Sequence, residues 1–162
     1  MSVNKERPHL YVLPEDDANR QLANGFYLDH SLDTRRMYIL RVAGGWTRVL
    51  DSFREEHVPM MDRYSARFMV LLVDFDDMEH RLEIVRAAIP ERLTERVFVL
   101  GTRSQPERLR QAIDSYESIG KALARDCRDD TQVTWSHELL RHNAGELERL
   151  RTHVRPFLFQ GA

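Results

Sequence analysis

Four short apolar runs, separated by segments long enough to form helices, constrain the fold of this 162-residue chain more than any other feature. The runs are residues 9–13, 37–42, 68–73 and 97–100. Short apolar runs bounded by proline, glycine or polar residues are typical of strands. Two parallel strands need a crossover of a dozen or more residues, and the spacing of the runs provides it. We therefore expect the α/β class, with an open sheet of about four parallel strands flanked by helices.

The segments between the runs have the spacing and end signals of helices. Acidic residues open the segment 15–24 and Gly25 follows it, which predicts a helix that ends before the glycine. Apolar side chains at helical spacing predict a second helix over about residues 46–56, with a loop over residues 57–66 behind it. A third helix is expected over residues 78–88.

The last third of the chain is expected to be helical. Pro106 suits the first turn of a helix, and we predict helices over residues 107–114, 116–127 and 136 to about 159. The chain is long enough for a single domain, with a core of about residues 9–115 and a helical C-terminal extension over 116–162. The apolar residues of the final helix would pack against the core, bind a partner or form a homo-oligomer.

Composition excludes several classes of protein. Charged residues make up 31% of the chain, and no apolar stretch approaches the roughly 20 residues of a membrane span, so we expect a cytoplasmic protein without a membrane partner. A single cysteine, Cys127, cannot form an internal disulfide or a cysteine-based zinc site. The net charge of −2 provides no overall attraction for nucleic acid, so such affinity would have to come from a local patch or a partner.

Polar and glycine residues follow each predicted strand, at the edge of a parallel sheet where ligands bind. They are Glu15, Asp16 and Asp17 after the first strand, Gly44 and Gly45 after the second, Asp74, Asp76 and Asp77 after the third, and Gly101 after the fourth. Carboxylates from two strands that meet at this edge would form an oxygen-only site suited to Mg²⁺ or Mn²⁺. The alternative is that these acids cap helix N-termini, which applies to any one of Glu15, Asp16, Asp17 and Asp77.

The order of these residues resembles the Toprim domain of topoisomerases, DnaG-type primases and OLD-type nucleases. That family has a glutamate after the first strand and an Asp-x-Asp motif after the third, which here are Glu15 in "YVLPED" and Asp74 with Asp76 in "LLVDFDD". The resemblance covers about residues 9–115. This chain departs from the family at the first motif, where an aspartate replaces the glycine that usually follows the glutamate.

The resemblance implies metal-dependent phosphodiester chemistry on nucleic acid, with DNA as the first candidate. Glu15, Asp74 and Asp76 would bind Mg²⁺ or Mn²⁺, Glu107 would be a further catalytic residue, and Lys121 or a nearby arginine would stabilise charge on the phosphate. The chain has no room for a topoisomerase tyrosine domain, which favours the nuclease branch. OLD-type relatives are joined to an ATPase module, so we expect an ATPase or DNA-binding partner, in anti-phage (antiviral) defence or DNA repair.

Two other classes of function remain open. A receiver-like regulatory domain, phosphorylated on Asp74, would also have acids after its first strand and a Thr or Ser after its fourth, for which Thr102 and Ser104 are available. No predicted strand is followed by the lysine that such domains normally have. The other alternative is a non-catalytic interaction subunit, in which the acids only cap helices and the C-terminal helix binds a partner.

Overall fold

A single parallel sheet lies at the centre of the molecule. The computed structural model describes residues 2–75, 78–102, 115–138 and 140–160. The strands are β1 (His9–Pro14), β2 (Met37–Ile39), β3 (Arg67–Leu72) and β4 (Val97–Leu100), in the spatial order β2-β1-β3-β4. All three pairs of neighbouring strands are parallel. The predicted α/β class is therefore confirmed.

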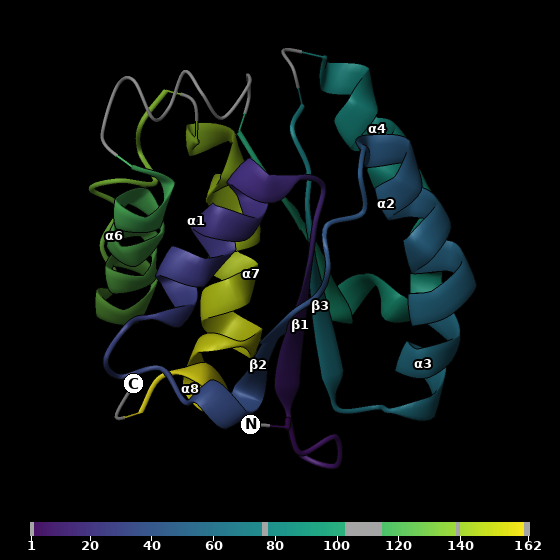
Figure 1. Cartoon of the computed structure of the whole chain (residues 1–162), viewed down its shortest axis with the longest axis horizontal. Helices are drawn as coiled ribbons and strands as arrows, with labels where there is room; N and C mark the ends of the chain where they lie inside the picture. Colours follow the sequence, from purple (N-terminus) through teal and green to yellow (C-terminus); the bar gives the residue numbers. More distant parts are fainter. Residues whose placement is uncertain (1, 76–77, 103–114, 139, 161–162) are drawn as a thin grey trace.

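Helices cover both faces of the sheet and make three layers (Figure 1). One face carries α1 (Asp17–Tyr27), α6 (Tyr116–Asp129), α7 (Ala144–His153) and α8 (Arg155–Leu158), and the other carries α2 (Trp46–Ser52), α3 (Val58–Arg63) and α4 (Glu79–Ala87). Short helical turns lie at η1 (Thr34–Arg36), η2 (Phe53–His57), η3 (Glu91–Arg96) and η4 (Arg141–Asn143). Each face of the sheet has its own cluster of buried apolar side chains, as expected for strands covered on both sides. Within the described residues, no helix is both long enough and apolar enough to span a bilayer.

The loop predicted over residues 57–66 is wrong for most of its length. A π-helical turn, Phe53–His57, continues α2, and α3 then runs from Val58 to Arg63. Pro59 lies directly after the π-helical turn, inside a helical stretch that is continuous from Trp46 to Arg63.

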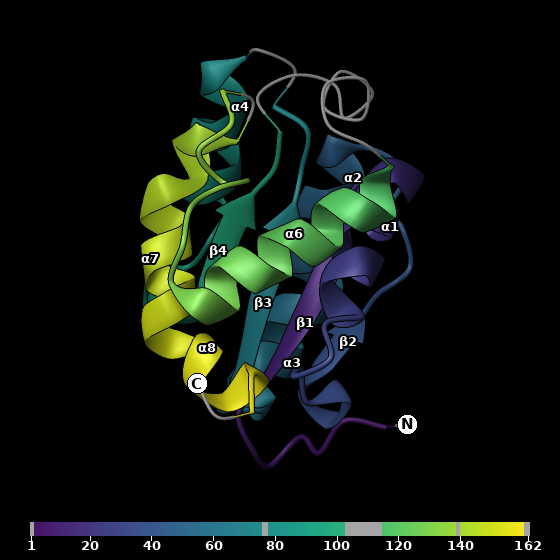
Figure 2. The same ribbon diagram turned by 90° about the vertical axis from the view of Figure 1, so that its left-hand side faces the viewer.

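The prediction that the first helix ends before Gly25 is wrong. Gly25 lies inside α1, where α1 crosses α6. A Cβ atom on Gly25 would lie 2.1 Å from the backbone oxygen of Glu117, and one on Gly120 would lie 2.1 Å from the backbone oxygen of Leu22. The two glycines therefore let the two helix backbones touch, and Figure 2 shows α6 crossing the strands beside α1. The absence of a side chain matters here for packing, not for helix termination.

The predicted helix from residue 136 to about 159 is only partly present. The chain between α6 and η4 makes turns in its described part, and helical structure resumes at η4, α7 and α8. The apolar residues of α7 and α8 are buried in the same cluster as Leu10 and Val12 of β1. The surface that suggested a homo-oligomer is thus used inside the chain.

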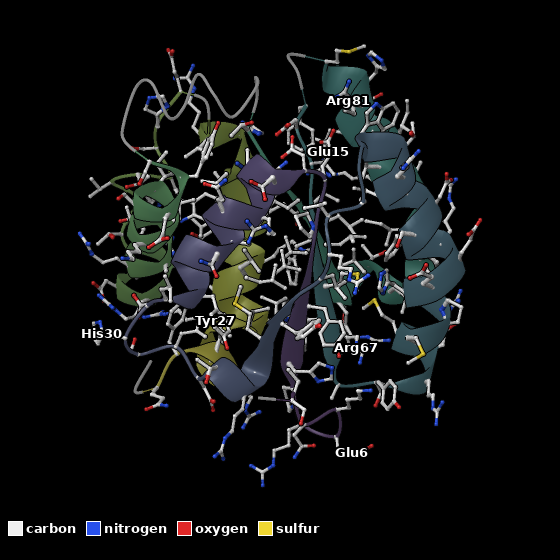
Figure 3. All side chains as sticks on the ribbon, viewed as in Figure 1. Glu6, Glu15, Tyr27, His30, Arg67 and Arg81 are labelled. Atoms are coloured by element: carbon white, nitrogen blue, oxygen red, sulfur yellow. The ribbon has the colours of Figure 1, made fainter. Side chains whose placement is uncertain are left out.

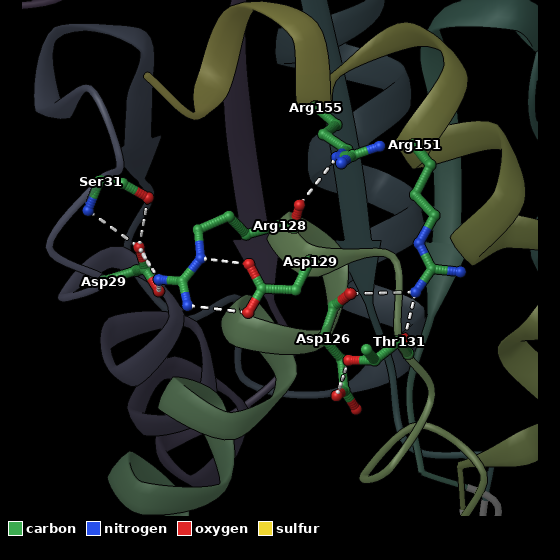
Figure 4. A network of polar contacts seen from close by, with 8 residues as sticks. All are labelled: Asp29, Ser31, Asp126, Arg128, Asp129, Thr131, Arg151 and Arg155. Atoms are coloured by element: carbon green, nitrogen blue, oxygen red, sulfur yellow. Dashed lines mark hydrogen bonds and ion pairs between the residues drawn. The ribbon is translucent and has the colours of Figure 1, made fainter. Parts of the chain in front are cut away.

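Arginines fix the C-terminal helices to α6, and α6 to the segment after α1 (Figure 4). Arg128 forms an ion pair with Asp29 at 2.8 Å, and Arg155 donates to the backbone oxygen of Arg128 at 3.0 Å. Arg151 donates to the backbone oxygen of Asp126 at 3.0 Å. Segments far apart in the sequence are thereby held together on one face of the sheet.

Side chains of η4 and α7 cover the outer edge of β4. Asn143 accepts from the backbone N–H of Gly101 at 3.2 Å and donates to its carbonyl oxygen at 2.9 Å. Glu146 accepts from the N–H of Val99 at 3.2 Å. These side chains satisfy backbone groups that would otherwise bond to a fifth strand, and they protect the edge from pairing with another chain.

Candidate active site

The structure brings Glu15 and Asp74 together at the carboxyl ends of β1 and β3. These strands are neighbours, and the backbone N–H of Glu15 donates to Leu72 at 2.9 Å just beyond the last paired residues. Glu15 Oε2 accepts from the backbone N–H of Asp74 at 2.6 Å. Both acids are buried, with 9% and 8% of their surface exposed. Figure 3 shows Glu15 at this end of the sheet together with Arg81.

The glycine pair after β2 holds the backbone of Glu15. The N–H groups of Gly44 and Gly45 both donate to the carbonyl oxygen of Glu15, at 2.9 and 3.3 Å. The φ angles of the two glycines are +92° and +140°, a region that residues with a side chain rarely adopt. The Gly-Gly sequence therefore positions Glu15 through the loop that follows the edge strand β2.

Asn19 connects the acids of two strand ends. Asp16 is the N-cap of α1 and accepts from the backbone N–H of Asn19 at 3.0 Å. The Asn19 side chain is fully buried, and its Nδ2 donates to Asp16 Oδ1 at 3.1 Å and to Asp74 Oδ1 at 3.3 Å. Its Oδ1 is buried without a hydrogen-bond partner among the described residues. A neutral amide thus lies between two carboxylates and leaves an oxygen unsatisfied beside them.

The clustering of acids changes their protonation. Burial, followed by the negative charges of Asp16 and Glu15, raises the pKa of Asp74 to about 8. Burial also raises the pKa of Glu15, although the hydrogen bond from the Asp74 N–H and the charge of Arg81 act in the opposite direction. The repulsion expected from the sequence is therefore present, and either a proton or a cation would relieve it.

Arg81 and Thr102 also contact Asp74, although neither was predicted from the sequence to stabilise charge or bind metal. Arg81 of α4 donates through Nη1 to the backbone oxygen of Asp74 at 2.6 Å, and its guanidinium carbon lies 4.9 Å from the centre of the Trp46 ring. Thr102, directly after β4, donates through Oγ1 to Asp74 Oδ1 at 3.4 Å. Thr102 was named only for the regulatory alternative, and the one signal for Arg81 was its place in the first turn of the helix that follows β3.

The other predicted site residues are not brought to this cluster by the described structure. Asp76 and Glu107 lie outside the described residues. Lys121 is on the exposed side of α6, where its ammonium group lies 3.5 Å from the carboxylate of Glu117 four residues earlier. The arginine that reaches the site is Arg81.

The donor chemistry suits Mg²⁺ or Mn²⁺. No three His, Cys, Asp or Glu side chains of the described residues are arranged to hold a metal ion. Mg²⁺ is, however, commonly bound through one or two carboxylates, with water and substrate oxygens completing its shell. Glu15 and Asp74 supply carboxylate oxygens at the ends of two neighbouring strands. The residues therefore fit a metal that keeps several waters.

Comparisons of this chain with protein-family models, curated proteins and solved structures find no match. Its function is therefore inferred from its own residues.

Proposed function

We propose that this chain performs metal-dependent phosphodiester chemistry on nucleic acid, as a Toprim-type nuclease subunit. The observation that carries the proposal is the approach of Glu15 and Asp74 from two neighbouring strands, where burial and the neighbouring charge of Asp16 raise the pKa of both acids. Uncompensated acids of this kind are retained at functional sites more readily than in structural cores.

Each residue has a separate task in this proposal. Asp74 and Glu15, together with Asp76, would hold Mg²⁺ or Mn²⁺, which when bound activates the attacking water and stabilises the leaving oxygen. The Gly44–Gly45 turn fixes the position of Glu15. Arg81 has a buried Nε without a partner among the described residues, so its guanidinium keeps a donor for a phosphate oxygen.

Cleavage of nucleic acid in the presence of Mn²⁺ or Mg²⁺ tests the proposal. Wild-type protein should cleave plasmid or single-stranded DNA only with metal, and Asp74→Asn should abolish cleavage while the protein stays folded. Asp17→Asn is the matched control, because Asp17 is exposed and, within the described part of the chain, bonds to Arg20 and Gln21 of its own helix α1. Equal activity of the Asp74 variant and wild type would contradict the proposal.

We also propose an ATPase or DNA-binding partner, in anti-phage defence or DNA repair. A near-neutral chain of this length lacks an extended basic clamp for DNA, and a partner would supply it. Affinity purification of the tagged chain from its native host should recover a nucleotide-binding or DNA-binding protein. Purification that recovers neither would count against a partner, and the cleavage assay should then be active with the chain alone.

A receiver-like regulatory domain is the second candidate, and the contact of Thr102 with Asp74 favours it. In that case Asp74 would accept a phosphoryl group from a small donor such as acetyl phosphate. Intact-protein mass spectrometry would then find one added phosphoryl group in wild type and none in Asp74→Asn. If neither cleavage nor phosphorylation occurs, the chain is a non-catalytic interaction subunit.

A further inference from the structure

A buried arginine without a carboxylate partner lies at the end of the sheet opposite the candidate active site. Arg67, the first residue of β3, is 2% exposed, and its Nη2 has no hydrogen-bond partner among the described residues. Its guanidinium carbon lies 3.9 Å from the centre of the Tyr11 ring and 5.0 Å from that of Tyr64. Aromatic faces, rather than acids, therefore stabilise its positive charge.

His9 keeps this region positive instead of neutralising it. Its Nδ1 lies 2.7 Å from the backbone oxygen of Arg7, and its Nε2 accepts from the Nε–H of Arg67 at 3.0 Å, so the ring is neutral with the proton on Nδ1. Burial lowers the pKa of His9, and the charges of Arg67, Lys5 and Arg36 lower it further. No carboxylate of the described residues forms an ion pair with Arg67, Lys5 or Arg63.

Aromatic and cationic side chains lie next to one another in a continuous series from Arg67 to the surface. Tyr38 of the edge strand β2 lies opposite Tyr11, with ring centres 5.3 Å apart, and it is 48% exposed. On the other side of Arg67, Lys5 Nζ lies 5.3 Å from the centre of the Tyr64 ring. We call this set, Tyr38, Tyr11, Arg67, Tyr64 and Lys5, the tyrosine–arginine row.

We propose that the tyrosine–arginine row binds single-stranded nucleic acid. An exposed tyrosine offers a face on which a base can stack, and the unpaired cations Lys5 and Arg63 lie where the phosphates of the same strand would follow. An anionic strand complements a surface on which cations without an ion-pair partner among the described residues lie beside an exposed aromatic ring. The choice of nucleic acid as the ligand rests on the proposed function. The row adds to that function a substrate-binding surface away from the acids.

Binding of a fluorescent oligothymidine, measured by anisotropy in EDTA, tests the row without requiring metal or cleavage. Tyr38→Ala should weaken binding about tenfold, the loss expected for one stacked base, whereas Tyr38→Phe should bind like wild type. Leu28→Ala is the matched control, because Leu28 is also 48% exposed and lies at the end of α1. Replacing Lys5 and Arg63 together by alanine should reduce the slope of log affinity against log salt by about 1.4, since each phosphate contact contributes about 0.7.

Three results would overturn the row as a binding surface. They are the absence of saturable binding by wild type, equal affinities of Tyr38→Ala and Leu28→Ala, and competition by polyglutamate as strong as that by unlabelled oligonucleotide. The last would identify an acidic polypeptide as the ligand. A wild type that binds the oligonucleotide through Tyr38 but never cleaves would support the row and refute only the proposed nuclease, so the two failures are distinguishable.

Discussion

At the scale of single residues, Asp74 is a carboxylate whose ionised form the folded state disfavours. It is buried, its neighbours Asp16 and Glu15 are acidic, and among the described residues its carboxylate accepts from the neutral side chains of Asn19 and Thr102. A residue selected for stability alone would not be an acid at this position. The sequence predicted the position of Asp74 because an acid that directly follows a buried strand lies at the edge of the sheet.

Asn19 and Arg81 could not be assigned to the site from the sequence in this way. Their approach to Asp74 depends on how α1 and α4 pack against the sheet, which no local pattern specifies. Asn19 did have one local signal, because it lies three residues after the N-cap Asp16 and so returns to the carboxyl end of β1.

The first prediction concerns the pH dependence of stability in EDTA. Because the pKa of Asp74 rises from 3.8 to about 8 on folding, the ionised carboxylate is disfavoured in the folded state. Asp74 therefore reduces the free energy of unfolding progressively as the pH rises from about 4 to about 8. Asp74→Asn should melt at a higher temperature than wild type at pH 8, and this difference should shrink toward pH 4. A constant difference across that range would mean that the Asp74 carboxyl is not held in its neutral form.

At the scale of secondary structure, the strands were predictable and the helix contacts were not. Continuous apolar runs identify strands buried on both faces, and all four strands begin within one residue of their predicted start, while β2 ends at Ile39, earlier than expected. Gly25 was misinterpreted because glycine has two structural uses. It allows close helix packing here instead of ending a helix, and the segment predicted as a loop after residue 56 is helical as far as Arg63.

The crossing of α1 and α6 gives the second prediction. Gly120→Ala should lower the free energy of unfolding by about 1–3 kcal/mol, because the new methyl group would meet the backbone of α1 and force the helices apart. Gly145→Ala is the control, since Gly145 lies in α7 with no atom within 4 Å of an added Cβ. That change should stabilise by up to about 1 kcal/mol through helix propensity. Urea denaturation of both variants checks the opposite signs, and effects of the same sign would contradict the packing role.

The covered edge of β4 gives the third prediction. Asn143→Ala removes the partners of both the N–H and the carbonyl oxygen of Gly101, and should cost about 2–3 kcal/mol because buried backbone groups are left unsatisfied. Asn4→Ala, an exposed change, should stay within about 0.5 kcal/mol of wild type. Thermal melting followed by sedimentation would also detect any association through the uncovered strand. A variant as stable as wild type would mean that water replaces the side chain at this edge.

At the scale of the whole molecule, the sheet has two ends of opposite character. Buried acids gather at the carboxyl ends of β1 and β3, and unpaired cations with tyrosines gather at the opposite end. The six residues of β1 separate the two ends by roughly 20 Å. The acidic end was foreseeable because residues after parallel strands share one edge. The basic end was not, since Lys5, Arg36 and Arg67 come from three separate segments that meet only in the fold.

The central claim, that the acids of β1 and β3 bind a divalent cation, is tested most directly by the melting temperature with and without Mn²⁺. Metal at about 100 times its dissociation constant stabilises the folded state by about 2.7 kcal/mol, which corresponds to roughly 5–10 °C for a domain of this size. Wild type and Asp17→Asn should show this shift, and Asp74→Asn should fold normally and show none. A wild type that does not respond to Mn²⁺, with an Asp74→Asn variant that unfolds, would contradict the claim and make these carboxylates structural.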